Sequence, residues 1–191
     1  MNAPVKPAKV AINGVDVPTL LGTIGAVSEH RDLAKFTFRA NGEWLNGTHT
    51  ATRINGYFGA GAEQGRGNDF VVEADHPAVL CGGDNAPTPP ELLLAALSAC
   101  ITAGIGNIAS ARQIKLDSVE TSLEADANLL GMLGLDDSVR NGFGAIRMNV
   151  KIQGDASADK LRQVVDQSVS RSAVFDMLTN GLPVTVGVDA G

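Results

Sequence analysis

The least polar stretch of the chain is TPPELLLAALSACITAGIGNIAS, residues 88–110. Thr88 is suited to cap a helix, Pro89 follows where no amide donor is needed, and Glu91 comes three residues after the cap. This order of residues is a capping box. It predicts a helix that runs from Thr88 to about Arg112.

The middle of this helix, roughly eighteen residues from 92 to 109, carries no charge and approaches the length that spans a bilayer. The remaining chain has soluble amphipathic patterns, and no aromatic or basic residues mark a membrane interface, so we expect no membrane contact. A helix that is apolar all round must be buried on every side, and the sheet of one domain covers only one side. We therefore expect a homodimer in which a second copy of the helix packs against small residues, namely Ala95, Ala96, Ala99, Ala103, Gly104 and Gly106.

The composition bounds the possible functions. The 191 residues are 44% hydrophobic and 19% charged, as in an ordinary soluble globular protein. The net charge of -6, with scattered Lys and Arg, argues against nucleic acid as a partner. The three histidines lie far apart, so no zinc-ligand spacing exists, and we expect neither a metal nor another cofactor.

The N-terminal residues lack a secretion signature, because Asn13, Asp16 and Pro18 interrupt their apolar residues. We therefore expect a cytoplasmic, reducing compartment. The two cysteines, Cys81 and Cys100, are too few for a disulfide framework, and in such a compartment they are free or redox-active.

Residues 1–33 read as an N-terminal arm with at most one strand, and residues 34–191 as a single domain. Phe36 and Phe38 alternate with polar residues, and Asn41-Gly42 predicts a tight hairpin turn after them. The glycine-rich stretch at 56–67 is predicted to be a surface loop, because its glycine spacing is one residue too long for the dinucleotide fingerprint.

The chain beyond the apolar helix returns to strand and helix patterns. Alternating residues predict strands, and apolar residues on one stripe predict a helix that begins at Ser157. These elements, strands, helix, strands, helix and strand, predict an α+β fold with segregated sheet and helices. Their ranges are a strand at 114–123, a loop at 128–142, a strand at 146–152, the helix from 157, a short piece at 174–178 and a last strand at 182–188.

Cys100 alone is best read as a small core residue, since free cysteine is among the most buried residue types. The wider pattern favours another interpretation. The segment PTPPELLLAALSAC, in which Cys100 follows Glu91 by nine residues, resembles the signature of the OsmC/Ohr family. The resemblance continues through GDNAP, IKLDSVETSLEAD and SRSAVFDMLTNGLPVTV and covers about residues 34–188. It implies antiparallel sheets around two central helices in an intertwined homodimer, and thiol-based reduction of organic hydroperoxides.

The resemblance also implies roles for individual residues. Cys100 would attack the peroxide bond as a thiolate and become a sulfenic acid, and Glu91 would hold an arginine that lowers the pKa of the thiol. Nine residues place Glu91 half a turn around the helix from Cys100 and separate the two along it at about 1.5 Å per residue. A shared site would therefore use Glu91 of the partner subunit.

Two departures from the family pattern affect this chemistry. The family's second cysteine, which forms a disulfide with the first, corresponds to Ser172, and serine cannot form a disulfide. Ser172 is also suited to cap a turn that begins at Val174. No arginine lies between residues 75 and 90, where His76 is the only potential cation, and Arg53 and Arg66 lie further upstream.

Cys81 is a candidate for the missing second thiol, because a mobile LCGGD loop could bring it to Cys100. The favoured interpretation is that Cys81 only fills an apolar strand end after Val79 and Leu80. Access and a positive potential, which thiol chemistry requires, have no sign in the sequence at this position.

The leading hypothesis is a thiol-dependent redox protein whose Cys100 reacts with a hydroperoxide or another apolar electrophile. An external thiol would recycle it through a mixed disulfide. The rival hypothesis is a small-molecule-binding module of the same fold in which Cys100 is an inert core residue, favoured by Ser172 and the missing arginine. A purely structural interaction protein is a third possibility, for which the sequence has no specific sign.

Overall fold

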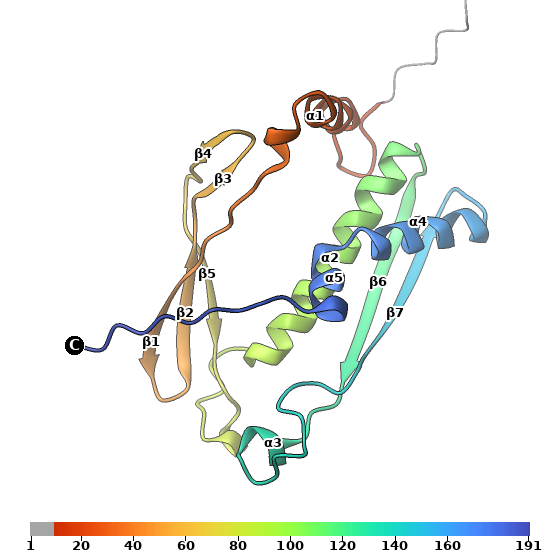
Figure 1. Ribbon diagram of the computed structural model, residues 1–191. Coiled ribbons are helices and arrows are strands. Elements are labelled where there is room, and N and C mark those ends of the chain that lie inside the picture. The colour runs from red at the N-terminus through yellow and green to blue at the C-terminus, as the bar shows by residue number, and fades with distance from the viewer. Residues whose placement is uncertain (1–9) are drawn as a thin grey trace, which may run out of the picture. The chain divides into compact units, whose positions relative to one another are not determined.

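The computed structural model describes residues 10–191. It is a mixed α+β structure with antiparallel sheets, as predicted (Figure 1). Its contacts fall into two compact units, one with residues 10–11 and 16–95 and the other with residues 12–15 and 96–191. The single domain expected from residue 34 onward stays a prediction.

The first unit contains a three-stranded antiparallel sheet in the order β1-β2-β5 and a separate two-stranded hairpin of β3 and β4. A helix and a 3-10 turn precede the sheet, and a second 3-10 turn follows it. Their bounds are α1 Val17–Glu29, η1 Arg31–Ala34, β1 Asn41–Asn46, β2 His49–Ile54, β3 Tyr57–Gly59, β4 Ala62–Gln64, β5 Phe70–Ala74 and η2 Ala78–Leu80.

The arm predicted at residues 1–33 holds a helix instead of a strand. Asp16 caps α1, since its carboxylate accepts a hydrogen bond from the amide of Thr19 at 3.1 Å. Pro18 lies in the first turn, where a missing amide costs nothing. A proline that interrupts an apolar run therefore starts a helix here. The part of the arm before residue 10 lies outside the described residues.

The first hairpin turns later than predicted. Asn41 and Gly42 lie inside β1, paired with Arg53 and Thr52, and the chain turns at Gly47, whose φ is +56°. The turn prediction at Asn41-Gly42 is therefore wrong. The residues before it form only the isolated bridge at Thr37, and the strand itself begins at Asn41.

The glycine-rich stretch is a hairpin, which corrects the loop prediction. Strands β3 and β4 pair antiparallel, and Ala60 and Gly61 turn the chain at φ values of +52° and +81°. Thr37 forms an isolated bridge with Phe58, so the segment around it runs beside β3. The ring of Phe36 lies where a Cβ on Gly59 would be, which explains the glycine at that position.

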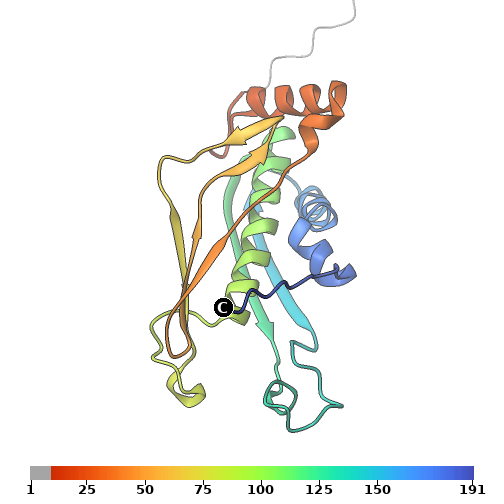
Figure 2. The ribbon, with the colours of Figure 1, turned by 60° about the vertical axis from the view of Figure 1, so that its left-hand side comes forward.

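The second unit is built on the antiparallel pair β6 (Leu116–Ala125) and β7 (Ile146–Gly154). The predicted alternation of half-buried and exposed residues is confirmed in both strands. The inward-facing residues pack against α2 (Pro89–Ala111) and α4 (Ala158–Ser170), which lie on the same face of the strand pair (Figure 2). The loop predicted at 128–142 contains the short helix α3 (Leu129–Met132).

The apolar helix α2 is confirmed within one residue of its predicted end. The single chain buries one face of it, and burial of the other side by a second copy stays a prediction. Its buried apolar residues repeat every four positions on one face, which packs against Leu161 and Val164 of α4. Among residues 10–191, α2 is the one helix long and apolar enough to cross a membrane by length and composition. The buried face of α2 consists of Leu97, Ile101, Ile105, Ala109 and Ser110.

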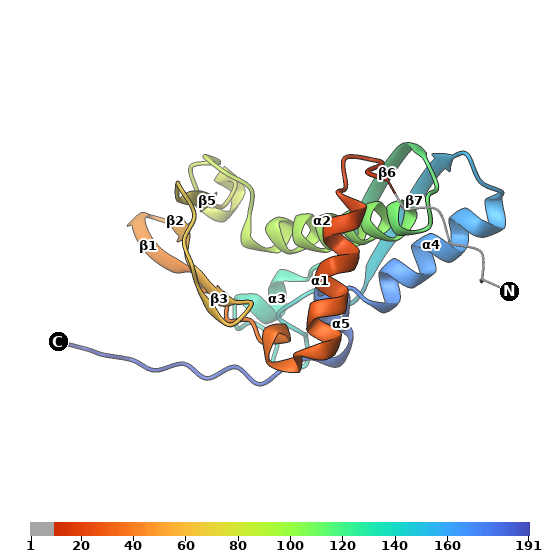
Figure 3. The same ribbon diagram turned by 90° about the horizontal axis from the view of Figure 1, so that it is seen from above.

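The last helix, α5 (Ala173–Asn180), corresponds to the short piece expected at 174–178. The strand predicted at 182–188 does not form. Residues 181–191 run on from α5 without helix or strand (Figure 3). The alternating valines Val184, Val186 and Val188 are at least 80% exposed. Alternation alone does not make a strand, because a strand also needs a hydrogen-bonded neighbour.

Candidate functional site

Cys100 lies at the middle of α2, where it is half-buried, and its sulfur has one hydroxyl neighbour. The hydroxyl of Ser172 donates a hydrogen bond to Sγ of Cys100 at 3.0 Å. Ser172 itself is only 5% exposed. Two of the three sequence-predicted site residues, seventy-two positions apart in the chain, are thus in direct contact.

Ser172 has a second role as the N-cap of α5, and this role fixes the position of its side chain. Its Oγ accepts a hydrogen bond from the amide of Phe175 at 3.2 Å. The predicted cap is confirmed, with the helix beginning at Ala173. A serine hydroxyl carries one proton and two acceptor lone pairs, so accepting from Phe175 leaves that proton free to point at Cys100.

The surroundings of Cys100 lower the pKa of its thiol. Burial acts in the opposite direction and would raise this pKa, but the hydrogen bond from Ser172 and those from the backbone amides of Val174 and Ala173 outweigh it. These donors are neutral groups at the start of a helix, where negative charge is favoured. An amide and hydroxyl cluster therefore lowers the pKa here, where the family resemblance implied an arginine.

The packing of α4 on α2 brings Ser172 to the sulfur. Ser168 of α4 is buried, and its hydroxyl donates to the carbonyl of Ile101 at 2.7 Å. A Cβ on Gly104 would overlap this hydroxyl, so glycine at this position allows the close approach of α4. Gly104 is predicted to face a second copy, but within the chain it accommodates α4. Sequence reasoning missed Ser168, because a buried serine on an amphipathic helix has no distinct pattern.

Glu91 does not belong to this cluster. Its Oε2 accepts hydrogen bonds from the amide of Thr88 at 2.7 Å and from the hydroxyl of Thr88 at 2.8 Å. The capping box is thereby confirmed, and these two bonds lower the pKa of Glu91. Its role beside Cys100 of a second copy stays a prediction.

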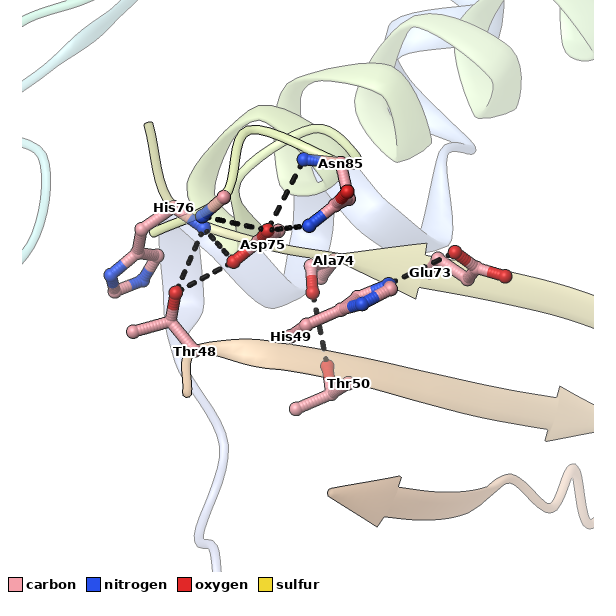
Figure 4. A network of polar contacts seen from close by, with 9 residues as sticks. Thr48, His49, Thr50, Glu73, Ala74, Asp75, His76 and Asn85 are labelled. Carbon is pink, nitrogen blue, oxygen red and sulfur yellow. Dashed lines mark hydrogen bonds and ion pairs between the residues drawn. The ribbon is translucent and has the colours of Figure 1, made fainter. Parts of the chain in front are cut away.

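A buried carboxylate organises the loop that leads into α2 (Figure 4). Asp75 accepts hydrogen bonds from the hydroxyl of Thr48 at 2.6 Å, the amides of His76 at 2.8 Å and Gly83 at 3.1 Å, and the side chain of Asn85 at 2.7 Å. The bond from Thr48 contributes most to holding the pKa of Asp75 well below its usual range, against the effect of burial. The carboxylate therefore stays charged, and its hydrogen bonds hold residues 76, 83 and 85 of the loop around it. The sequence has no signal for this network.

Cys81 lies at the end of η2, within the loop that Asp75 closes. It is exposed and has a left-handed φ of +63°. The expectation that it fills an apolar strand end is wrong, since Val79 beside it is also 87% exposed.

Of the two upstream arginines, Arg66 donates to the carbonyl of Asn55 at 2.9 Å, and its guanidinium lies over the ring of Tyr57.

The described residues contain no group of three or more His, Cys, Asp or Glu side chains placed to hold a metal ion. The site around Cys100 combines one half-buried thiol with a lowered pKa, three neutral hydrogen-bond donors and a serine in place of a second thiol at position 172.

Comparison with known proteins relates the chain to one family. The family model described as OsmC-like protein matches residues 82–187, which is more than half of the chain and includes both Cys100 and Ser172. A search of curated proteins gave no match.

Solved structures share the fold at low identity. An OsmC-like protein from Mycoplasma pneumoniae is 15% identical, with a TM-score of 0.56, over 80% of this chain and 96% of that one. An organic hydroperoxide resistance protein OsmC from Legionella pneumophila is 16% identical, with a TM-score of 0.52, over 76% and 90%. An OsmC-like protein of unknown function from Vibrio cholerae is 12% identical, with a TM-score of 0.52, over 75% and 94%. From the family match and this shared fold, we conclude that the chain belongs to the OsmC-like protein family.

Proposed function

We propose that this protein is a thiol-dependent redox protein that reduces organic hydroperoxides or related apolar electrophiles through Cys100. The observation that carries the proposal is the hydrogen bond from the buried hydroxyl of Ser172 to Sγ of Cys100, at the start of α5. Only the thiolate attacks a peroxide, and these donors favour the thiolate. The name of the Legionella pneumophila structure, an organic hydroperoxide resistance protein, supports this class of substrate.

The proposed reaction has two stages. The Cys100 thiolate attacks one peroxide oxygen, the O–O bond breaks, and the products are a sulfenic acid and an alcohol after the leaving alkoxide takes up one proton. The sulfur is oxidised by two electrons and the hydroperoxide is reduced by two. An external thiol then condenses with the sulfenic acid, releasing water and leaving a mixed disulfide, and a second thiol restores the thiolate.

The proposed active form is a cytoplasmic homodimer. In the single chain the alanines on one side of α2 are exposed, which fits a second copy packed there. Glu91 cannot reach Cys100 along a straight helix, since nine residues at about 1.5 Å each separate them. Glu91 of the partner subunit is therefore the one proposed to help orient groups at Cys100.

Replacement of the thiol tests the proposal. We expect Cys100→Ser to reduce consumption of cumene hydroperoxide, with dithiothreitol as reductant, to the rate without protein. Cys81→Ser is the matched control, because Cys81 is the other cysteine of the sequence, and we expect it to keep most of the activity. Full activity of Cys100→Ser would refute the proposal.

The rival hypothesis, a binding module with an inert Cys100, predicts a different thiol. A packed core cysteine has a raised pKa and resists alkylation even at pH 8. The half-burial of Cys100 and its lowered pKa favour the redox proposal. Rapid reaction of Cys100 with iodoacetamide at pH 6 would support it further, whereas resistance at pH 8 would favour the rival.

A further inference from the structure

Position 172 decides what can happen to Cys100 after its first oxidation. The group in contact with Sγ of Cys100 is a hydroxyl, which cannot condense with a sulfenic acid to form a disulfide. Ser172 is buried and fixed by the amide of Phe175, so it remains beside the sulfur. The first oxidation product is therefore left to react with a molecule from solution.

The donors around the sulfur favour negative charge on the oxidised group as well. The hydroxyl of Ser172 and the amides at the start of α5 act on Cys100 through hydrogen bonds and the helix dipole. Charge on a sulfenate is shared between its sulfur and its oxygen, so the same donors favour the sulfenate anion over the neutral sulfenic acid. The anion is the form that attacks a second hydroperoxide.

We propose that Cys100 is readily oxidised beyond the sulfenic acid to the sulfinic acid, so that hydroperoxide in excess over external thiol inactivates the protein. This inference rests on the proposed function. In the added step, the sulfenate attacks a second hydroperoxide, the O–O bond breaks, and a sulfinate and an alcohol form. The sulfur loses two more electrons, which the hydroperoxide accepts, and no other reactant is needed. Sulfinic acid is not reduced by ordinary thiols, so the step is a one-way switch.

The test is oxidation with excess cumene hydroperoxide in the absence of thiol, followed by mass spectrometry of the intact protein and of the Cys100 peptide. We expect wild type and Cys81→Ser to gain two oxygen atoms at Cys100 and to remain inactive after dithiothreitol is added. Ser172→Cys supplies a thiol at the position now held by the hydroxyl. A disulfide between Cys100 and this introduced thiol should replace most of the sulfinate, and dithiothreitol should restore both thiols. Circular dichroism checks that this variant is folded.

A second experiment uses the wild-type protein alone and does not depend on any variant. Dithiothreitol present from the start should lower the sulfinate fraction in wild type progressively as its concentration rises, because thiol and hydroperoxide compete for the same intermediate. A single added oxygen that persists in excess hydroperoxide, or a Cys81–Cys100 disulfide in wild type, would overturn the inference and leave the proposed function standing. A Cys100 that is left as the unmodified thiol, with neither an added oxygen nor a disulfide, would instead remove the proposed function itself.

Discussion

At the scale of single residues, Ser172 links the fold to the chemistry. Its hydroxyl accepts from the amide of Phe175 and donates to the sulfur of Cys100, so one side chain both starts α5 and stabilises the thiolate. A cation next to a thiolate is sensitive to salt, whereas neutral donors at a helix start act at short range. The reactivity of Cys100 should therefore depend on Ser172 much more than on ionic strength.

Ser172→Ala tests this dependence. Loss of a donor to the thiolate raises the pKa of Cys100, so alkylation by iodoacetamide shifts to higher pH. A hydrogen bond to a charged group contributes about 1.5 kcal/mol or more, so alkylation at neutral pH should slow about tenfold. The two rates should converge at a pH well above both pKa values, where the thiolate is fully formed in each protein.

Ser157→Ala is the matched control for Ser172→Ala. Ser157 caps α4 by accepting from the amide of Lys160 at 3.4 Å and is not a partner of Cys100. Loss of either cap should lower the free energy of unfolding by about 1 kcal/mol. Only Ser172→Ala should change the alkylation profile, and equal profiles for both variants would show that the hydroxyl does not act on the thiolate.

Asn13 is a residue whose importance could not be predicted from the sequence. Its amide donates to the carbonyl of Ile114 at 2.9 Å and to the hydroxyl of Ser110, and it accepts from the amide of Leu116 at 2.9 Å. The Asn13-Gly14 pair is a recognisable turn signal, and both residues have positive φ. Its partners lie about a hundred residues further along the chain, and no local pattern could indicate them.

At the scale of elements, prediction worked where the determinants are local. The capping box of Thr88 and Glu91 and the cap at Ser157 belong to the helices that they start, and both helices form as predicted. The alternation in β6 and β7 is equally local and is also confirmed. The candidate site was found in part: the cap role of Ser172 is local, and its place beside Cys100 was implied by the family resemblance alone, because that contact depends on how α4 packs.

Prediction failed where an element depends on a distant partner. The segment 182–188 has the alternation of a strand, but no neighbour pairs with it among residues 10–191. Asn41-Gly42 has turn chemistry, but the register with β2 places it inside a strand. Both errors have the same physical cause, since strand pairing is set by residues far apart in the sequence.

The approach of α4 to α2 predicts opposite effects for two glycines of the same helix. A methyl group at Gly104 would overlap the hydroxyl of Ser168, and overpacking of this kind costs about 1–3 kcal/mol. No atom lies within 4 Å of the position that a Cβ on Gly106 would take. Gly104→Ala should therefore be destabilised in urea unfolding, whereas Gly106→Ala should gain up to about 1 kcal/mol from helix propensity. Equal stabilities would mean that α2 and α4 are not in close contact at Gly104.

At the scale of the whole molecule, the single chain exposes apolar surface that a soluble protein usually covers. Phe38, Trp44 and Phe70 of the first unit are between 59% and 70% exposed. In the second unit, α2 buries one face in the core, while Ala96 and Ala99 on the same helix are exposed. Small residues on an exposed helix face allow a second helix to approach closely, and a two-fold dimer that uses this face would pack the same patch of both subunits together.

Ala96→Glu tests this assembly. If a second α2 packs on the exposed alanines, the glutamate buries an unpaired charge in the symmetric interface, twice per dimer, and such burial costs several kcal/mol. We expect size-exclusion chromatography with light scattering to find wild type as a dimer at micromolar concentration and Ala96→Glu as a folded monomer. Gln163→Glu is the control, since it adds the same charge at an exposed position of α4, and it should remain dimeric. A monomeric wild type, or an Ala96→Glu dimer as stable as that of the control, would contradict an α2-centred interface, and the partner subunit could then no longer be the source of a Glu91 near Cys100.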